Sequence, residues 1–258
     1  MSAYGRSGET DLPRRAILGV PVVALPWDGA IETMHAMIAG KRFALITWLN
    51  AHNANLAHEN DDFRQALARF LVLPDGVGVD IASKLLHGAP FPANLNGTDF
   101  TPALLQAQIN PLRVGLIGAR PDVVEKAASS FRQLAPQHEF RVISDGFFRT
   151  ADEPRILEIL KNFHPHILLV AMGVPRQEMF MAKHLTAEHC LLAFGVGALF
   201  DFRAGAVPRA PRLVQKLRLE WLYRLAQEPA RLWRRYIVGN PLFLLRVMRA
   251  KLKGSRGA

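Results

Sequence analysis

The sequence contains a single cysteine, Cys190, so no disulfide can form within this 258-residue chain. Cys190 lies in an apolar run, which favours a buried, inert thiol over a reactive one and fits a reducing cytoplasm. No segment reaches the ~18 uninterrupted apolar residues typical of a membrane-spanning helix. The polar first fifteen residues lack the apolar core of a signal peptide. These absences predict a cytoplasmic protein whose membrane contact, where it has any, is peripheral.

Several catalytic signatures are missing as well. The sequence has no Asp-x-Asp pair that could bridge a metal ion to a diphosphate, and no Gly-x-Ser-x-Gly elbow. His52 and His58 are six residues apart, and His164 and His166 flank a proline, so neither pair has zinc-helix spacing. We therefore predict no metal and no cofactor, and expect arginines and helix N-termini to meet negative charge at any site.

Acidic residues are scarce near the C-terminus. Residues 203–258 hold fourteen Lys and Arg but two Glu, a net charge of +12, which leaves −2 for the rest of the chain. Prolines divide this tail into short helical pieces. We expect a flexible leader over 1–15, an α/β core over 16–205 and a basic helical appendage over 206–258.

The tail interleaves Leu and aromatic side chains with Arg and Lys, a pattern suited to the headgroups of an anionic membrane. The alternative is a helix pair docked on the body with its basic face in solvent. Nucleic-acid binding would need a phosphate-tracking basic stripe, which this pattern does not form. The residues expected to contact the membrane or an acceptor are Arg209, Arg212, Arg224, Arg231, Arg234 and Arg235.

Half of the residues are hydrophobic, and the body alternates short apolar runs with amphipathic stretches, as in βαβ proteins. We expect strands at 43–49, 70–73, 113–117, 140–144, 167–171 and 191–195. Helices are expected at 61–70, 79–86, 99–107, 122–134, 153–163 and 178–185. The apolar strands favour a mostly parallel sheet whose carboxyl-end turns form a ligand crevice.

One such turn carries a carboxylate, in Leu73-Pro-Asp75-Gly76-Val-Gly78. Held at the carboxyl end of a strand, Asp75 could act as a general base toward a hydroxyl. It could equally be the N-cap of a helix that begins near residue 79. The spacing alone leaves both interpretations open.

Two further turns have the form of phosphate sites. Asn96-Gly97-Thr98-Asp99 precedes a helix, where Thr98 or Asp99 could simply cap it or the free N–H groups could bind a phosphate. The stretch from Gly118 to Arg120 joins a strand to a helix, but it is not Gly-x-Gly-x-x-Gly, so the dinucleotide fingerprint is absent.

The most informative turn is Gly173-Val-Pro175-Arg176-Gln177-Glu178, which follows an apolar strand. Arg176 could neutralise a phosphate, and Gln177 offers both a donor and an acceptor to a sugar or base. Glu178 could instead be an ordinary first-turn helix charge. Three such side chains at one strand end favour a binding site.

A last glycine-rich turn runs from Gly195 through Gly197 to Phe200 and Asp201. The glycines allow close approach of a ligand, Phe200 could stack on a nucleobase, and Asp201 could accept a hydrogen bond from a ribose or base. A core phenylalanine beside an Asp–Arg pair is the alternative, and this turn alone favours it.

Together, these stretches resemble the WecG/TagA/CpsF family of bacterial glycosyltransferases over about residues 17–243. The segments that carry the resemblance are 49–51, 74–76, 96–99, 173–178, 195–201, 209–212, 219–224 and 234–236. It implies a Rossmann-like core and an inverting, metal-independent transfer from a UDP-sugar to a polyprenyl-diphosphate-linked sugar at the inner face of the cytoplasmic membrane. It also implies that Asp75 is the base and that Gln177, Asn50 and Asp201 contact the donor.

The full set of expected donor-binding residues is Asn50, Gly76, Asn96, Gly97, Thr98, Asp99, Gly118, Arg120, Gly173, Pro175, Arg176, Gln177, Glu178, Gly195, Gly197, Phe200 and Asp201. The oligomeric state is left open, with a homo-oligomer as one alternative. Two other classes are weighed against the transferase, a nucleotide-dependent oxidoreductase and a nucleic-acid-binding protein.

One departure concerns the donor. The family commonly shows Thr-x-Asn in the first site strand, whereas here Trp48 precedes Leu49-Asn50 and Thr47 lies one place earlier. This form is similar to the glucosyltransferases of xanthan- and acetan-type exopolysaccharide assembly. We therefore expect UDP-glucose as the donor, with UDP-N-acetylmannosamine or its uronate as the alternative.

Overall fold

The computed structural model describes residues 12–254, apart from the side chains of Arg212 and Lys216. Most of the expected leader, residues 1–11, lies outside this part, and Arg14 and Arg15 already belong to the first strand. Eight strands form one sheet: β1 (Arg14–Ile17), β2 (Val20–Val23), β3 (Ala44–Leu49), β4 (Phe70–Pro74), β5 (Arg113–Gly118), β6 (Glu139–Ser144), β7 (Ile167–Ala171) and β8 (Leu192–Gly195).

The strand order is β1-β2-β4-β3-β8-β7-β5-β6, and every neighbouring pair is parallel except β1 and β2. The predicted α/β fold with a mostly parallel sheet is confirmed. The β1–β2 hairpin was not predicted. Its strands are four residues long, and its turn at Leu18 and Gly19 has positive φ at both residues without an Asn-Gly or Asp-Gly signal.

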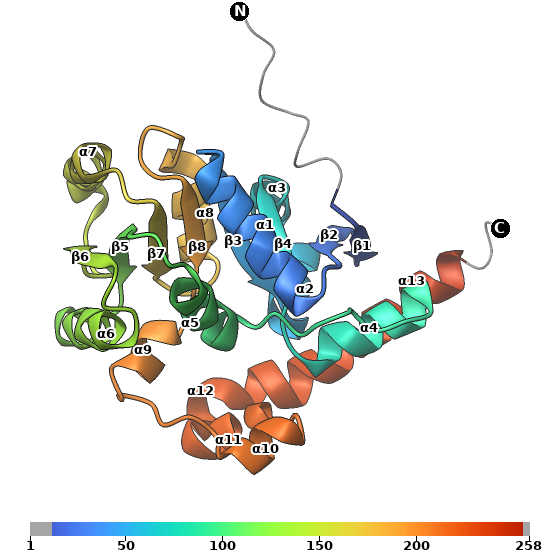
Figure 1. Ribbon diagram of the computed structural model, residues 1–258. Coiled ribbons are helices and arrows are strands. Elements are labelled where there is room, and N and C mark those ends of the chain that lie inside the picture. The colour runs from blue at the N-terminus through green and yellow to red at the C-terminus, as the bar shows by residue number, and fades with distance from the viewer. Residues whose placement is uncertain (1–11, 255–258) are drawn as a thin grey trace, which may run out of the picture.

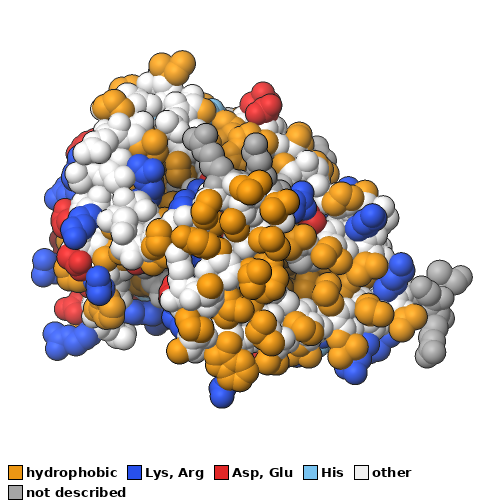
Figure 2. Space-filling model, turned by 90° about the horizontal axis from the view of Figure 1, so that it is seen from below, with side chains coloured by type: hydrophobic (Ala, Val, Ile, Leu, Met, Phe, Trp, Pro, Cys, Tyr) orange, Lys and Arg blue, Asp and Glu red, His pale blue; other side chains and the backbone are white. Residues whose placement is uncertain are grey.

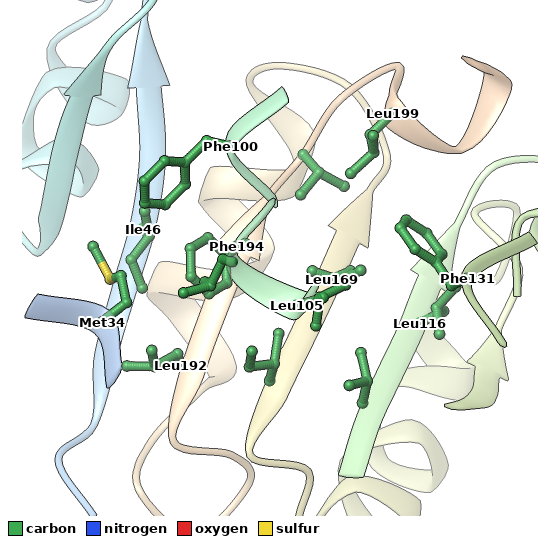
Figure 3. Close-up of a cluster of buried hydrophobic side chains, with 14 of the residues drawn as sticks. Met34, Ile46, Phe100, Leu105, Leu116, Phe131, Leu169, Leu192, Phe194 and Leu199 are labelled. Carbon is green, nitrogen blue, oxygen red and sulfur yellow. The ribbon is translucent and has the colours of Figure 1, made fainter. Parts of the chain in front are cut away.

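Helices cover both faces of the sheet (Figure 1). Adjacent strand residues point to opposite faces, so Ile46 and Trp48 enter one hydrophobic core while Leu45 and Leu49 enter the other. Figure 3 shows the first core, where side chains from the strands meet Met34, Phe100 and Phe131 from helices. This core is covered by α1 (Trp27–Ala39), α5 (Gly97–Ala107), α6 (Pro121–Leu134) and α9 (Leu199–Arg203).

The second core lies under α2 (Ala51–Glu59), α3 (Asp61–Leu67), α4 (Val77–His87), α7 (Glu153–Phe163) and α8 (Arg176–His184). A single 3₁₀ turn, η1 (Thr150–Asp152), precedes α7. Neither α1 nor α2 was predicted. The nine residues of α2 are mostly Ala, Asn and His, so its sequence lacks the wide apolar stripe that indicates a helix.

The C-terminal part is helical: α10 (Arg212–Lys216), α11 (Glu220–Gln227), α12 (Pro229–Trp233), the π-helical turn η2 (Arg234–Val238) and α13 (Gly239–Gly254). The prolines predicted short pieces, which α10–α12 are, whereas α13 runs for 16 residues with Pro241 in its first turn. In Figure 1, α10–α12 lie together beside the body, and α13 runs back under α4. Within residues 12–254, no helix has the length and apolarity needed to cross a membrane. The division at residues 205–206 stays a prediction.

Helix α13 is docked on the body through both apolar and polar contacts. Phe243 and Val247 are buried in the second core. Arg246 donates to Asn55 Oδ1 at 3.0 Å and forms an ion pair with Glu59 at 2.6 Å. The appendage is therefore anchored at its end, while α10–α12 reach across the edge of the sheet.

Candidate active site

Two adjoining cavities lie where β3, β4, β7 and β8 end. The larger, about 510 Å³, is lined by the turns after β3, β7 and β8 and by the start of α5. The smaller, about 370 Å³, lies between α4 and the appendage. The residues that line both are Asn50, His52, Asp75, Thr98, Phe202, Arg224 and Arg235. The two cavities therefore meet around Asp75.

Asp75 is held by the neighbouring strand end. The backbone N–H of Asp75 donates to Leu49 O at 2.9 Å, and its carboxylate Oδ2 accepts from Asn50 Nδ2 at 3.1 Å. Gly76 follows with φ +88°, a conformation that favours glycine, and its N–H donates to Asn94. Helix α4 is capped at Gly76 without a side-chain bond, so Asp75 does not cap it.

Burial raises the pKa of Asp75, although the Asn50 hydrogen bond and the charges of Arg235 and Arg224 act in the opposite direction. A carboxylate with a raised pKa is a stronger base than an ordinary aspartate. His52, on the same junction, has its pKa lowered to about 4 by burial and by Arg235, so its imidazole is neutral near pH 7.

Asn96 and Asp99 form the start of α5. Asn96 Oδ1 accepts from Asp99 N at 3.1 Å, so Asn96 is the helix cap rather than Thr98 or Asp99. Asp99 is in an ion pair with Arg209, which also contacts Glu220 at 3.2 Å. Burial would raise the pKa of Asp99, but hydrogen bonds from Arg209 and Asn96 outweigh it and lower that pKa. Asp99 therefore ties the appendage to the body.

Gln177 and Glu178 lie beneath the larger cavity. Both are buried, and Gln177 Nε2 donates to Glu178 Oε1 at 2.8 Å. Gln177 Oε1 accepts from the Gly197 N–H at 3.2 Å. Glu178 is thus not the exposed first-turn charge that the sequence left open, and burial raises its pKa.

Three arginines of the appendage line the larger cavity, namely Arg224, Arg231 and Arg235. Arg231 is paired with Glu228, whereas among the described residues neither Arg224 nor Arg235 forms an ion pair with a carboxylate. Their Nε atoms are buried without a hydrogen-bond partner in the described part of the chain. Unpaired guanidinium groups beside a cavity suit an anionic ligand such as a diphosphate.

The structure brings together most of the residues predicted for the site. Asn50, Asp75, Gly97, Thr98, Gly173, Gln177, Gly195, Gly197 and Asp201 line the larger cavity. Gly76, Asn96 and Arg209 line the smaller one. Pro175 follows a cis peptide bond at the start of α8. Burial raises the pKa of Asp201.

Arg176 does not reach the cavities. Its guanidinium donates to Gly146 O at 2.6 Å and Phe148 O at 3.1 Å and lies over the Phe148 ring. It lines a separate groove between α3 and α8. The side chain at this helix start points back over the preceding loop.

Phe200 cannot stack on a nucleobase because it is completely buried and packs on Phe131, as the alternative interpretation held. Arg120 is exposed and pairs with Asp122 at 3.4 Å. Gly118 packs against Ala171, and neither Gly118 nor Arg120 lines the two cavities. Arg234 lies over Trp233 outside them, and the side chain of Arg212 falls outside the described atoms.

Sequence reasoning missed His52, Phe202, Trp221 and Tyr236, which all line the cavities. Phe202 also lies under the guanidinium of Arg224, 5.2 Å from ring centroid to Cζ. Trp48 lines the larger cavity with its indole against Gly97. The interleaving of aromatic and basic residues in the tail could have indicated Trp221 and Tyr236 as cavity residues. In the sequence, this pattern instead predicts membrane contact.

A family model and several known proteins match this chain in sequence. The model of the Glycosyl transferase WecG/TagA/CpsF family matches residues 15–257. A Bacillus spizizenii N-acetylglucosaminyldiphosphoundecaprenol N-acetyl-beta-D-mannosaminyltransferase is 35% identical over 167 residues, 64% of this chain and 63% of that protein, just under two thirds of its length. Proteins of the same description from Bacillus subtilis and Staphylococcus aureus are 30% identical over 80% of this chain (79% of theirs) and 32% identical over 70% (70% of theirs).

The contact between Trp48 and Gly97 can be tested by overpacking. Gly97→Ala would place a methyl group 3.2 Å from three carbons of the buried indole, whose Nε1 is held by Leu95 O. We expect the free energy of unfolding, measured by urea titration, to fall by about 1–3 kcal/mol.

Gly78→Ala, in α4, is the control, because its added methyl would lie 3.5 Å from the nearest atom, Ala51 Cβ, at ordinary van der Waals distance. It should be neutral or stabilising. Adding Trp48→Ala should remove the clash, so the two changes should not be additive. Additive losses of unfolding free energy would show that Gly97 and Trp48 are not in close contact.

Proposed function

Because the chain belongs to the WecG/TagA/CpsF family of glycosyl transferases, we propose that it transfers a sugar from a UDP-sugar to a sugar carried on a polyprenyl diphosphate. The observation that carries this proposal is the junction of two cavities at Asp75. A transferase needs two substrate sites that meet at one base. The family assignment favours this function over an oxidoreductase or a nucleic-acid-binding protein.

The donor is assigned to the larger cavity. Its glycine turns after β7 and β8 let a ligand approach the backbone, and Asp201 offers a carboxylate to a ribose or base. Arg224, Arg231 and Arg235 border it and would stabilise the diphosphate as it leaves. This role replaces the one expected for Arg176.

The acceptor is assigned to the smaller cavity, where Trp221, Phe243 and Leu244 add apolar surface to a lining that also holds Arg224 and Arg235. Such a lining suits a lipid-linked phosphate. Asp75 takes the proton of the acceptor hydroxyl while that oxygen bonds to the anomeric carbon. The bond from this carbon to the UDP oxygen breaks on the opposite face, which inverts the anomeric configuration.

The relatives support N-acetylmannosamine, the alternative donor sugar, rather than glucose. Each protein described above is named as an N-acetyl-beta-D-mannosaminyltransferase that acts on N-acetylglucosaminyldiphosphoundecaprenol. We therefore propose UDP-N-acetylmannosamine and a polyprenyl-diphosphate-linked N-acetylglucosamine as substrates. A place in exopolysaccharide synthesis rests only on the Trp48 form and stays a prediction, as does a homo-oligomer.

We also propose that the appendage contacts the inner face of the cytoplasmic membrane. Figure 2 shows hydrophobic side chains gathered over much of the face seen from below, with Lys and Arg mostly toward its edges. Large exposed apolar side chains on this part of the chain are Leu213, Leu217, Leu219, Leu222, Trp233, Ile237, Val238, Leu245, Met248 and Leu252. Exposed apolar groups bordered by basic residues are typical of interfacial membrane binding.

The role of Asp75 is tested by Asp75→Asn, which keeps the shape and can still accept from Asn50. We expect the turnover number to fall about 10²–10⁴-fold, because the general base is lost. UDP affinity, measured by calorimetry, should stay near wild type. The wild-type kcat/KM should fall with decreasing pH at a higher pH than for an ordinary aspartate, because the base must be ionised and its pKa is raised. Near-normal turnover of the variant would remove Asp75 from this role.

The donor is tested by measuring transfer to a polyprenyl-diphosphate-linked N-acetylglucosamine from different UDP-sugars. We expect UDP-N-acetylmannosamine to give a higher kcat/KM than UDP-glucose. Thermal stabilisation by each nucleotide sugar provides a second measurement that does not require the acceptor. A preference for UDP-glucose would restore the expectation drawn from Trp48.

Membrane contact is tested by the double variant Trp233→Gln/Ile237→Gln in flotation with phosphatidylglycerol vesicles. Losing two exposed apolar anchors should weaken binding at least about tenfold. Ile109→Gln is the control, since Ile109 is 84% exposed but lies between α5 and β5, outside the appendage. Equal flotation of the wild type, the double variant and the control would refute the proposal that this surface binds the membrane.

A further inference from the structure

A buried carboxyl group joins three separate segments under the larger cavity. Glu178, in α8, is completely buried. Its Oε1 accepts from Thr47 Oγ1 of β3 and from Gln177 Nε2, both at 2.8 Å. Its Oε2 has no hydrogen-bond partner in the described part of the chain. Such an arrangement costs stability, because a buried polar atom without a partner keeps its desolvation penalty.

The carboxyl group determines which way the Gln177 amide points. Glu178 Oε1 accepts from both the Thr47 hydroxyl and the Gln177 NH₂ group, so the amide presents its NH₂ group to the carboxyl. The amide oxygen is then directed toward the Gly197 N–H, from which it accepts at 3.2 Å. The orientation of the Gln177 amide thus determines its hydrogen bond to the turn after β8.

This turn lies in close contact with the same pair. A Cβ atom on Gly195 would be 2.9 Å from Gln177 Nε2 and 3.2 Å from Glu178 Oε1. Only glycine leaves room for the two side chains beneath the strand end. The Gly195–Gly197 turn, whose backbone lines the larger cavity, therefore rests directly on Gln177 and Glu178.

We propose that Thr47 and Glu178 are positioning residues, which orient the Gln177 amide and thereby hold the Gly195–Gly197 turn in the shape that binds the nucleotide-sugar donor. This inference rests on the proposed function, because it assigns the donor to the larger cavity. Buried polar networks that cost stability are expected where they serve a site. Thr47 acts from the face of β3 opposite to Trp48, so the two neighbours support the cavity in different ways.

The test removes the Thr47 hydroxyl without changing its shape, in Thr47→Val. We expect the Kd of UDP and the KM of the donor to rise about tenfold, as a lost hydrogen bond to an acidic group predicts. The KM of the acceptor should stay within about twofold of wild type, because the smaller cavity is untouched. Hydrogen exchange of the peptide that spans residues 195–198 should become faster.

Two matched variants separate positioning from general stability. Thr47→Ser keeps the hydroxyl that donates to Glu178. It should restore the KM of the sugar donor and the slow hydrogen exchange at residues 195–198. Thr101→Val removes another completely buried hydroxyl, which has no partner among the described residues and lies in α5. It should leave the donor KM and exchange at 195–198 unchanged. Glu178→Gln, which preserves volume, provides a second route if Thr47→Val folds poorly, and it should raise the donor KM without changing the acceptor KM.

The outcomes distinguish the two proposals. A wild-type protein that neither binds UDP nor transfers a sugar would refute the proposed function, and hydrogen exchange at 195–198 would still decide whether Thr47 holds the turn. If the wild type binds UDP while Thr47→Val matches Thr101→Val in UDP affinity, donor KM and exchange, the positioning role is overturned.

Discussion

The carboxyl ends of β3, β4, β7 and β8 meet at one edge of the sheet, and the contacts of the cleft depend on that meeting. Asn50 follows β3 and Asp75 follows β4, so a hydrogen bond joins two strand ends that are 25 positions apart. Gln177 follows β7 and reaches Gly197 after β8. Parallel pairing and a hydrophobic core on each face hold these ends in register, so the side chains need little ordering when a ligand binds.

Charge is divided between the body and the appendage. The body contributes the carboxylates of Asp75 and Asp201 together with amides, whereas the guanidinium groups at the cavities come from residues beyond 205. Arg209 and Arg246 are used in ion pairs that attach the appendage to Asp99 and Glu59. Arg224 and Arg235 lack such partners among the described residues and remain available for an anion. A single basic segment thus carries both structural and ligand-facing arginines.

Stability is given up in several places near the cavities. Asp75 and Glu178 are carboxyl groups whose pKa values burial raises, so their ionised forms are costly in the folded protein. Gly97 and Gly195 lie where a methyl group would collide with Trp48 or Gln177. Tight packing around polar groups is the expected cost of a rigid site.

The sequence by itself determined the fold class, the parallel sheet, the basic helical tail and the turns that build the cleft, because strand periodicity, prolines and local charge are properties of neighbouring residues. It also pointed to Asp75 and Gln177 through their position after strands, and the family resemblance added Asn50. It could not show that Arg176 turns away, that Phe200 is buried, or that Arg224 and Arg235 face Asp75 rather than only a membrane. Those outcomes depend on side-chain direction and on how the appendage folds back over the sheet. Both are set by contacts between residues far apart in the chain, which tertiary structure alone decides.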